Sequence, residues 1–221
     1  MNLPIGEPSA RNAEMMNVRS LVHIVDDDPS MRYAIAAVLR SVDIRSAAYD
    51  SCQAFLAADV DDVPGCLLLD VRLPGVSGLD FQTSMQGHGI RLPVIMITAH
   101  ADVPMSVRAM KAGAVDFLPK PFRDQDLLDA VGIAIDRDIR RRSADDQLGK
   151  VKACYETLST REKQVMGLVT SGKLNKQAAH ELGLSEITVK LYRASAMKKM
   201  GARSLADFVR MAERLDIRPQ A

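Results

Sequence analysis

The sequence predicts two domains: an α/β domain with a five-stranded, parallel, doubly wound sheet, and then a small all-α helix-turn-helix domain. Between residues 20 and 135, short apolar runs alternate with amphipathic segments, as in a parallel sheet covered by helices on both faces. Residues 156–214 show helical patterns only. Residues 1–149 hold 15 basic and 21 acidic side chains, a net charge of −6, whereas residues 150–221 hold 14 and 7, a net +7. This division favours a cation as partner of the first part and a polyanion as partner of the second.

Five apolar runs are the expected strands of the first domain. They cover residues 21–25, 44–49, 66–69, 93–97 and 114–118. Between them, apolar residues recur at helical spacing. We therefore expect helices at residues 29–39, 54–58, 78–86 and 102–112, and a fifth helix from residue 124 to about 142.

The remaining segments set the domain limits. We expect a mobile tail at residues 1–18, the α/β domain at 19–136, a helical linker at 137–155 and the second domain at 156–221. The linker is rich in Arg and Asp and shows no clear apolar stripe, so we interpret it as a solvated extension of the fifth helix.

The second domain contains four expected helices. Ser159 or Thr160 caps the first, which ends at Gly172, and the others cover residues 175–182, 186–200 and a segment after Ser204. A short helix, a turn containing glycine and a longer basic helix are typical of a helix-turn-helix.

Composition excludes several classes of protein. No apolar run reaches the roughly 18 residues that a membrane span needs. The first 18 residues lack the apolar core of a secretory signal, and the three cysteines show neither a disulfide framework nor metal-site spacing. We therefore expect a cytoplasmic protein with no membrane partner.

Polar residues follow four of the five expected strands. Asp26 and Asp27 follow the first, Asp70 the third, Thr98 the fourth and Lys120 the fifth. The carboxyl ends of parallel strands form the edge where ligands bind in open α/β sheets. Clustered carboxylates repel one another unless they share a cation, and oxygen ligands favour Mg²⁺. With a hydroxyl and an ammonium beside them, they suit the transfer of a phosphoryl group to an Asp. Because the sequence has no GxxxxGK[ST] loop, the donor must be another molecule.

Residues 20–135 resemble a response-regulator receiver domain, which has a flavodoxin-like fold. The resemblance rests on Asp26-Asp27-Asp28, on residues 69–78 (LDVRLPGVSG), on Thr98-Ala99 and on residues 116–122 (DFLPKPF). It implies that Asp70 accepts the phosphoryl group and that Thr98 and Lys120 bind its oxygens. It also implies that Mg²⁺ is held by Asp26, Asp27, Asp70 and the backbone carbonyl of Arg72. Thr98 and Phe117 are implied as switch residues, and the Lys120–Pro121 bond is expected to be cis. By contrast, Asp28 is better placed to cap the following helix than to bind a metal.

Residues 156–214 resemble the LuxR-type helix-turn-helix of the NarL/FixJ subfamily. The resemblance rests on residues 158–162 (LSTRE), 175–179 (NKQAA), 184–185 (LS), 188–190 (TVK) and 197–200 (MKKM). It implies that residues 186–200 form the recognition helix in the major groove of DNA.

Contacts to DNA come from the surface of that helix. We expect Lys190, Leu191 and Ala194, with Arg193 as a further candidate, at base edges, and Thr188, Tyr192, Lys198 and Lys199 at phosphates. We expect Ile187, Val189, Ala196, Met197 and Met200 to face the core of the domain.

The resemblance as a whole implies a transcriptional regulator, not an enzyme. A sensor histidine kinase would phosphorylate Asp70, and the receiver would then dimerise through its fourth helix and fifth strand, around Met105, Arg108, Met110, Lys111 and Asp116. One alternative is a constitutive DNA-binding regulator whose receiver serves as a dimerisation platform. Another is an aspartyl-phosphate phosphatase, which Arg72 disfavours because such enzymes need a second acid two residues after the nucleophile.

Overall fold

A computed structural model describes residues 20–59, 61–100 and 102–217. The tail expected at residues 1–18 lies outside these ranges. The chain forms two compact units that divide between Arg142 and Ser143.

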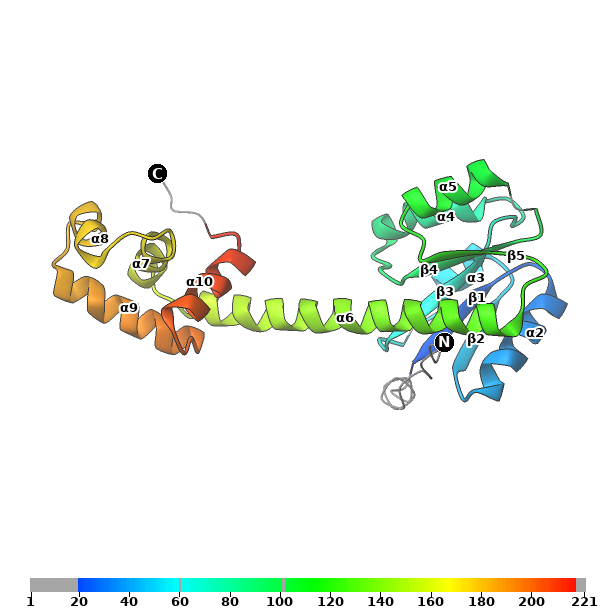
Figure 1. Ribbon diagram of the computed structural model, residues 1–221, viewed down its shortest axis with the longest axis horizontal. Coiled ribbons are helices and arrows are strands. Elements are labelled where there is room, and N and C mark those ends of the chain that lie inside the picture. Colours follow the sequence, from blue (N-terminus) through cyan, green and yellow to red (C-terminus); the bar gives the residue numbers. More distant parts are fainter. Residues whose placement is uncertain (1–19, 60, 101, 218–221) are drawn as a thin grey trace, which may run out of the picture. The chain divides into compact units, whose positions relative to one another are not determined.

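The first unit contains a five-stranded parallel sheet, as predicted, with the strand order β2-β1-β3-β4-β5. Its strands are β1 (Leu21–Val25), β2 (Arg45–Tyr49), β3 (Gly65–Asp70), β4 (Val94–Thr98) and β5 (Asp116–Pro119) (Figure 1). The three central strands are buried along almost their whole length because helices cover both faces.

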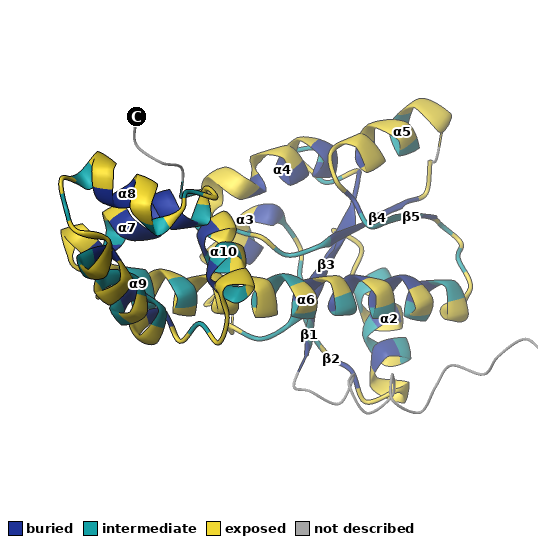
Figure 2. Cartoon of the chain, turned by 60° about the vertical axis from the view of Figure 1, so that its left-hand side comes forward, coloured by how far each residue is buried: buried dark blue, intermediate teal, exposed yellow. Residues whose placement is uncertain are grey.

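Each face of the sheet has its own apolar core. Helices α2 (Pro29–Ser41) and α6 (Asp124–Glu156) cover one face through Ile35, Leu39, Leu127 and Val131. The other face carries α3 (Cys52–Ala57), α4 (Gly78–Ser84), the short 3-10 helix η1 (Met85–His88) and α5 (Val103–Lys111). Figure 2 shows the buried sides of these helices turned toward the sheet.

Strand β5 begins two residues later than the sequence suggests. Gly113 has a φ of 92°, and the Ala114 N–H still donates to the carbonyl of Ala109 at the end of α5. Pairing with β4 starts at Asp116, opposite Ile95. Ala114 therefore belongs to the turn that follows α5, although it is apolar and buried.

Helix α6 includes the expected helical linker, but part of that linker is not solvated. Its 33 residues run through the expected linker without a break. Asp138, in the segment expected to face water, is fully buried. The prediction of a solvated extension is therefore wrong at this position. A charge-rich sequence does not show which of its charged side chains are buried and paired with other groups of the protein.

The buried carboxylate of Asp138 joins α6 to the start of β3. Its Oδ2 accepts a hydrogen bond of 3.1 Å from the Gly65 N–H and one of 2.8 Å from Arg142 Nε, and its Oδ1 accepts from Arg141 at 2.6 Å. Arg142 also pairs with Asp62 on the preceding loop. A side chain at position 65 would have its Cβ 2.1 Å from the carbonyl oxygen of Leu21. Only glycine therefore allows the backbones of β1 and β3 to lie this close at this point.

The second unit is all-helical, as predicted. It contains α7 (Thr160–Thr170), α8 (Asn175–Leu182), α9 (Glu186–Met200) and α10 (Leu205–Arg214), as well as the end of α6. Gly183 and Gly201 end α8 and α9 in the left-handed conformation. Phe208 and Met166 form one small core, and Val165 and Val189 a second.

The start of α7 is fixed by a capping box. The Ser159 Oγ accepts from the Glu162 N–H, and the Glu162 Oε2 accepts from the Ser159 N–H at 2.7 Å. Glu162 is buried and also accepts from Ser195 Oγ at 2.6 Å and from Lys199 Nζ at 2.7 Å, both on α9. These bonds hold α7 and α9 together and lower the pKa of Glu162 to about 2, with the Lys199 bond as the main cause.

Within the described ranges, no helix combines the length and the apolar character needed to cross a membrane.

Candidate functional site

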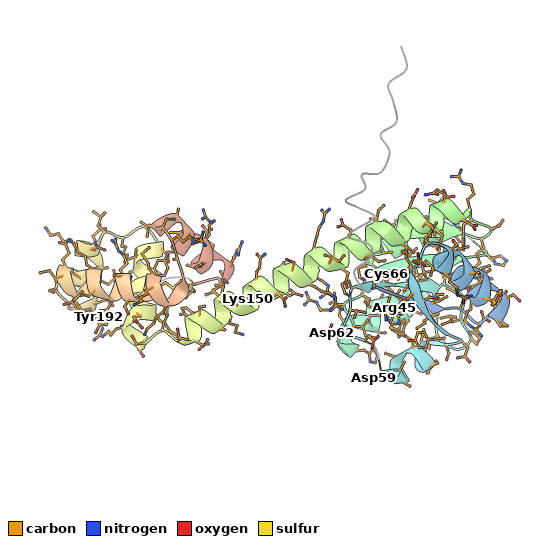
Figure 3. The ribbon with its side chains drawn as sticks, turned by 90° about the horizontal axis from the view of Figure 1, so that it is seen from below. Arg45, Asp59, Asp62, Cys66, Lys150 and Tyr192 are labelled. Carbon is orange, nitrogen blue, oxygen red and sulfur yellow. The ribbon has the colours of Figure 1, made fainter. Side chains whose placement is uncertain are left out.

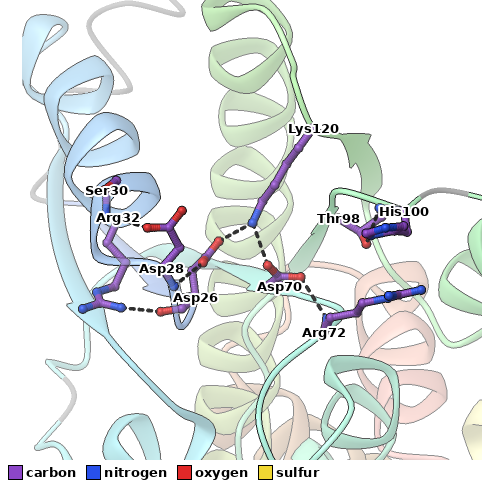
Figure 4. Close-up of polar contacts among 9 residues, drawn as sticks. All are labelled: Asp26, Asp28, Ser30, Arg32, Asp70, Arg72, Thr98, His100 and Lys120. Atoms are coloured by element: carbon purple, nitrogen blue, oxygen red, sulfur yellow. Dashed lines mark hydrogen bonds and ion pairs between the residues drawn. The ribbon is translucent and has the colours of Figure 1, made fainter.

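Three carboxylates meet at the carboxyl edge of the sheet. Asp26 follows β1 and Asp70 ends β3, and these strands are neighbours, so the two side chains lie side by side (Figure 4). One oxygen each of Asp26, Asp27 and Asp70 can be chosen so that all three lie within 4.8 Å of one another. Asp26 and Asp70 are buried, whereas Asp27 is exposed. The structure thus brings together the three acids that the sequence singled out.

Lys120, which follows β5, supplies a positive charge to this cluster. Its Nζ lies 2.6 Å from Asp26 Oδ2 and 2.6 Å from Asp70 Oδ2 (Figure 4). Burial raises the pKa of Asp26, against the opposing effect of Lys120. Burial alone would lower the pKa of Lys120, but its bonds to the two carboxylates outweigh this effect and raise it. The ammonium therefore stays charged and partly neutralises the pair.

Thr98 and Arg72 are the other two residues expected at this edge (Figure 4). Thr98 ends β4 and is buried, and its Oγ1 accepts from the His100 N–H at 3.3 Å. The Arg72 N–H donates to Asp70 Oδ1 at 2.9 Å, which fixes the orientation of that carboxylate. The Lys120–Pro121 bond is cis, as the resemblance implies. Phe117 on β5 is half-buried and packs against the core on the side of α4 and α5.

Two residues at the start of α2 hold Asp26 in place. Asp28 caps this helix, as predicted, by accepting from the Ser30 N–H at 2.8 Å, and its own N–H donates to Asp26 Oδ1 at 2.9 Å. Arg32 donates to the backbone carbonyl of Asp26 at 2.6 Å. Arg32 was not among the residues expected at this site, although its place four residues after Asp28 puts it on the same side of the helix.

The donor set at this edge fits a magnesium ion. All the candidate ligands are oxygens, and at least one of the acids is exposed, so that an ion could keep part of its water shell. The buried acids outnumber the single ammonium, so a divalent cation would offset the remaining negative charge. Carboxylate, hydroxyl and ammonium groups at one strand edge can together accept and hold a phosphoryl group.

A second candidate surface lies on α9 of the helical unit. Lys190, Leu191, Ala194 and Lys198 are exposed. Tyr192, labelled in Figure 3, is half-buried and packs against the core formed by Val165 and Val189.

Four of the residues expected at DNA have polar partners within the unit. Arg193 donates to Asn175 Oδ1 at 3.3 Å, and Thr188 Oγ1 lies 2.8 Å from Ser185 Oγ. Lys199 pairs with Glu162 and also donates to the carbonyl of Thr157. Lys190 forms an exposed ion pair of 3.1 Å with Glu186.

The expectation that Ile187 faces the core is wrong. Its side chain is 72% exposed, whereas Val189, Ala196 and Met200 are buried as expected and Met197 is half-buried. Position 187 lies in the first turn of α9, and in this turn Val189 is the residue whose side chain faces the core. An isoleucine between polar neighbours suggests a core position, and only the geometry of the helix shows otherwise.

Comparisons with known proteins match both units. Residues 22–132 match the family described as response regulator receiver domain, and residues 156–212 match bacterial regulatory proteins of the luxR family. Nodulation protein W of Bradyrhizobium diazoefficiens is 54% identical over 91% of this chain and 88% of its own length. Transcriptional regulatory protein FixJ of Azorhizobium caulinodans is 41% identical over 86% and 90%. The solved structure of the response regulator StyR has a TM-score of 0.76 and 41% identity, covering 89% of this chain and 99% of that one.

Proposed function

This chain belongs to the response regulators of the NarL/FixJ family, and we propose that a phosphoryl group on Asp70 controls its binding to DNA. Its receiver and LuxR-type domains make it a transcriptional regulator of the two-component type. The phosphoryl donor is a sensor histidine kinase, and the protein acts on double-stranded DNA in the cytoplasm. The observation that carries the proposal is the placement of Lys120 Nζ 2.6 Å from both Asp26 and Asp70.

Asp70 is the proposed phosphoryl acceptor. One of its oxygens forms a bond to phosphorus while the bond from phosphorus to the kinase histidine breaks, and the product is an acyl phosphate. The Arg72 N–H already holds Asp70 Oδ1, so Oδ2, which contacts Lys120, is the oxygen placed to react. After the transfer, the Lys120 ammonium would pair with the phosphoryl oxygens, which then carry the negative charge.

Asp26, Asp27, Asp70 and the backbone carbonyl of Arg72 are the proposed ligands of Mg²⁺. When bound, the ion supplies positive charge to the phosphoryl oxygens. Arg32 and the Asp28 N–H contribute by fixing the position of Asp26.

Thr98 and Phe117 are the proposed switch residues. The Thr98 hydroxyl, which now accepts from the His100 N–H, would turn to donate to a phosphoryl oxygen, and the half-buried Phe117 would fill the space beside it. Such a change shifts the protein toward a second packing only if the phosphoryl group makes better contacts there.

The surface of α5 and β5 is the proposed homodimer contact, around Met105, Arg108, Met110, Lys111 and Asp116. Supporting this, α5 exposes three large apolar side chains at positions i, i+4 and i+7, namely Val103, Val107 and Met110. An apolar stripe on the outer side of a helix favours contact with another protein surface.

On α9, Lys190, Leu191 and Ala194, with Arg193 as a further candidate, are proposed at base edges. Thr188, Tyr192, Lys198 and Lys199 are proposed at phosphates. Of these, Lys198 is exposed on the surface, whereas Lys199 would have to share its ammonium with Glu162.

The test is incubation of the full chain with acetyl phosphate, with and without Mg²⁺, followed by peptide mapping, sizing and DNA binding. We expect a Mg²⁺-dependent phosphate on Asp70, a dimer and tighter DNA binding, all lost in Asp70→Asn. Asp59→Asn, which changes an exposed acid between α3 and β3, is the matched control. DNA binding that is equally tight in Asp70→Asn and in phosphorylated wild type would favour the constitutive regulator, and turnover of a phosphoester would favour a phosphatase.

A further inference from the structure

Two large aliphatic side chains are exposed one helical turn apart on α9. Ile187 is 72% exposed and Leu191 is 66% exposed. Positions i and i+4 lie on the same side of a helix, so the two side chains form one apolar patch. The buried side of the same helix is formed by Val189, Ala196 and Met200, and the patch is therefore no part of the core.

The surroundings of this patch are polar and mainly basic, and the acidic neighbour, Glu186, is paired with Lys190. Lys190 lies between the two residues in sequence and is exposed, and Lys198 follows further along the helix. Residues 150–221 carry a net charge of +7. A surface with this charge is complementary to a polyanion, which makes an apolar protein partner a poor match for the patch.

DNA offers one apolar group to a helix in its major groove. The C5-methyl group of thymine is the apolar feature on the base edges, and apolar side chains contact it. Residues near the N-terminus of a recognition helix are those that reach base edges, and Ile187 is the second residue of α9. An aliphatic side chain cannot form a hydrogen bond to phosphate, and a contact of Ile187 with DNA that depends on sequence must be with a base edge in the groove.

We propose that Ile187, together with Leu191, selects thymine in the operator by packing against its methyl group. This inference rests on the proposed DNA-binding function and adds a base preference to it. Neighbouring Thr188 does not compete for the position, since it is half-buried and bonded to Ser185.

The experiment begins with selection of DNA sites from a random library by the phosphorylated full chain. In the selected site, each thymine is then replaced by uracil, which removes the methyl group and leaves every hydrogen-bonding group in place. We expect wild type to lose about fourfold in affinity at one or two thymines, the value of one buried methyl group. In Ile187→Ala, affinity for the thymine site should fall and at least one of these uracil effects should disappear.

Leu174→Ala is the matched control, because Leu174 is 69% exposed in the same unit but lies outside α9. It should keep the full uracil effect. Since Ile187 contributes nothing to the core, Ile187→Ala should fold normally.

The outcomes separate the two proposals. If the phosphorylated chain selects no DNA site, both the proposed function and this inference fail. If it selects sites that lack thymine, or if uracil replacement has no effect, the inference alone is overturned. The same holds if Ile187→Ala retains every uracil effect, or if it changes self-association in place of base preference.

Discussion

Asp26 and Asp70 share a single ammonium group, the Nζ of Lys120, which lies 2.6 Å from an oxygen of each. The three side chains are almost completely shielded from water. The arrangement is therefore a buried ion triad in which the cation cannot be removed without leaving two carboxylates facing one another.

Replacing Lys120 by Met should destabilise the first unit by about 3–5 kcal/mol, the usual cost of leaving a buried charge without its partner. The pKa of Asp26, already raised by burial, should rise further. Urea unfolding, monitored by hydrogen exchange of the β3 amides, measures the loss of stability. Added Mg²⁺ should restore part of the stability, because it replaces the missing charge. Lys111→Met, at an exposed lysine, is the control, and equal stability of the two variants would contradict the expectation.

Asp27→Asn should weaken Mg²⁺ binding about tenfold, equivalent to about 1.4 kcal/mol, with little change in stability. The reason is that Asp27 is the exposed member of the cluster and therefore bears little of the fold's packing. Calorimetric titration with Mg²⁺ gives the affinity. Asp28→Ala should do the opposite: it removes the cap of α2 at a cost of about 1 kcal/mol but leaves Mg²⁺ affinity nearly unchanged. A loss of affinity confined to Asp28→Ala would reverse the two assignments.

Asp138→Ala should cost about 3–5 kcal/mol, because it leaves the Gly65 N–H without its acceptor and two arginines without their shared carboxylate. Asp136→Ala, two residues earlier on α6, removes an exposed i,i+4 pair with Arg140 and should cost less than about 0.5 kcal/mol. Hydrogen exchange of the β1 and β3 amides reports the difference, and similar protection in both variants would show that Asp138 is no anchor.

The second unit should lose stability in acid through Glu162. The folded-state pKa of this group is lowered from 4.5 to about 2, so its contribution is fully present above pH 4.5 and is lost as the pH falls toward 2. Glu162→Gln should already lack this contribution at pH 6 and should show a smaller further loss in acid. Exchange of the α7 amides between pH 6 and 3 measures the effect. Glu156→Gln, at an exposed pair with Lys163, should behave as wild type.

The acidic site could be predicted from the sequence because parallel strands deliver their last residues to one edge. Asp26, Asp70 and Thr98 each stand directly after an apolar run and Lys120 two residues after one, and the order of the strands brings them together. Asp138 could not be predicted, because its partners lie on a distant strand and on its own helix. Ile187 was predicted wrongly for the related reason that hydrophobicity gives a residue's character but not the direction of its side chain.

The bond between Asp138 and Gly65 bears on how the receiver is cut from this chain for separate study. A fragment ending at residue 136, where sequence patterns place the boundary, would discard Asp138 with both of its arginines and strip the first amide of a central strand of its acceptor. A fragment ending after Arg142 would keep all of them. Phosphorylation kinetics measured on the shorter fragment would describe a destabilised domain. A receiver fragment should therefore extend at least six residues beyond residue 136.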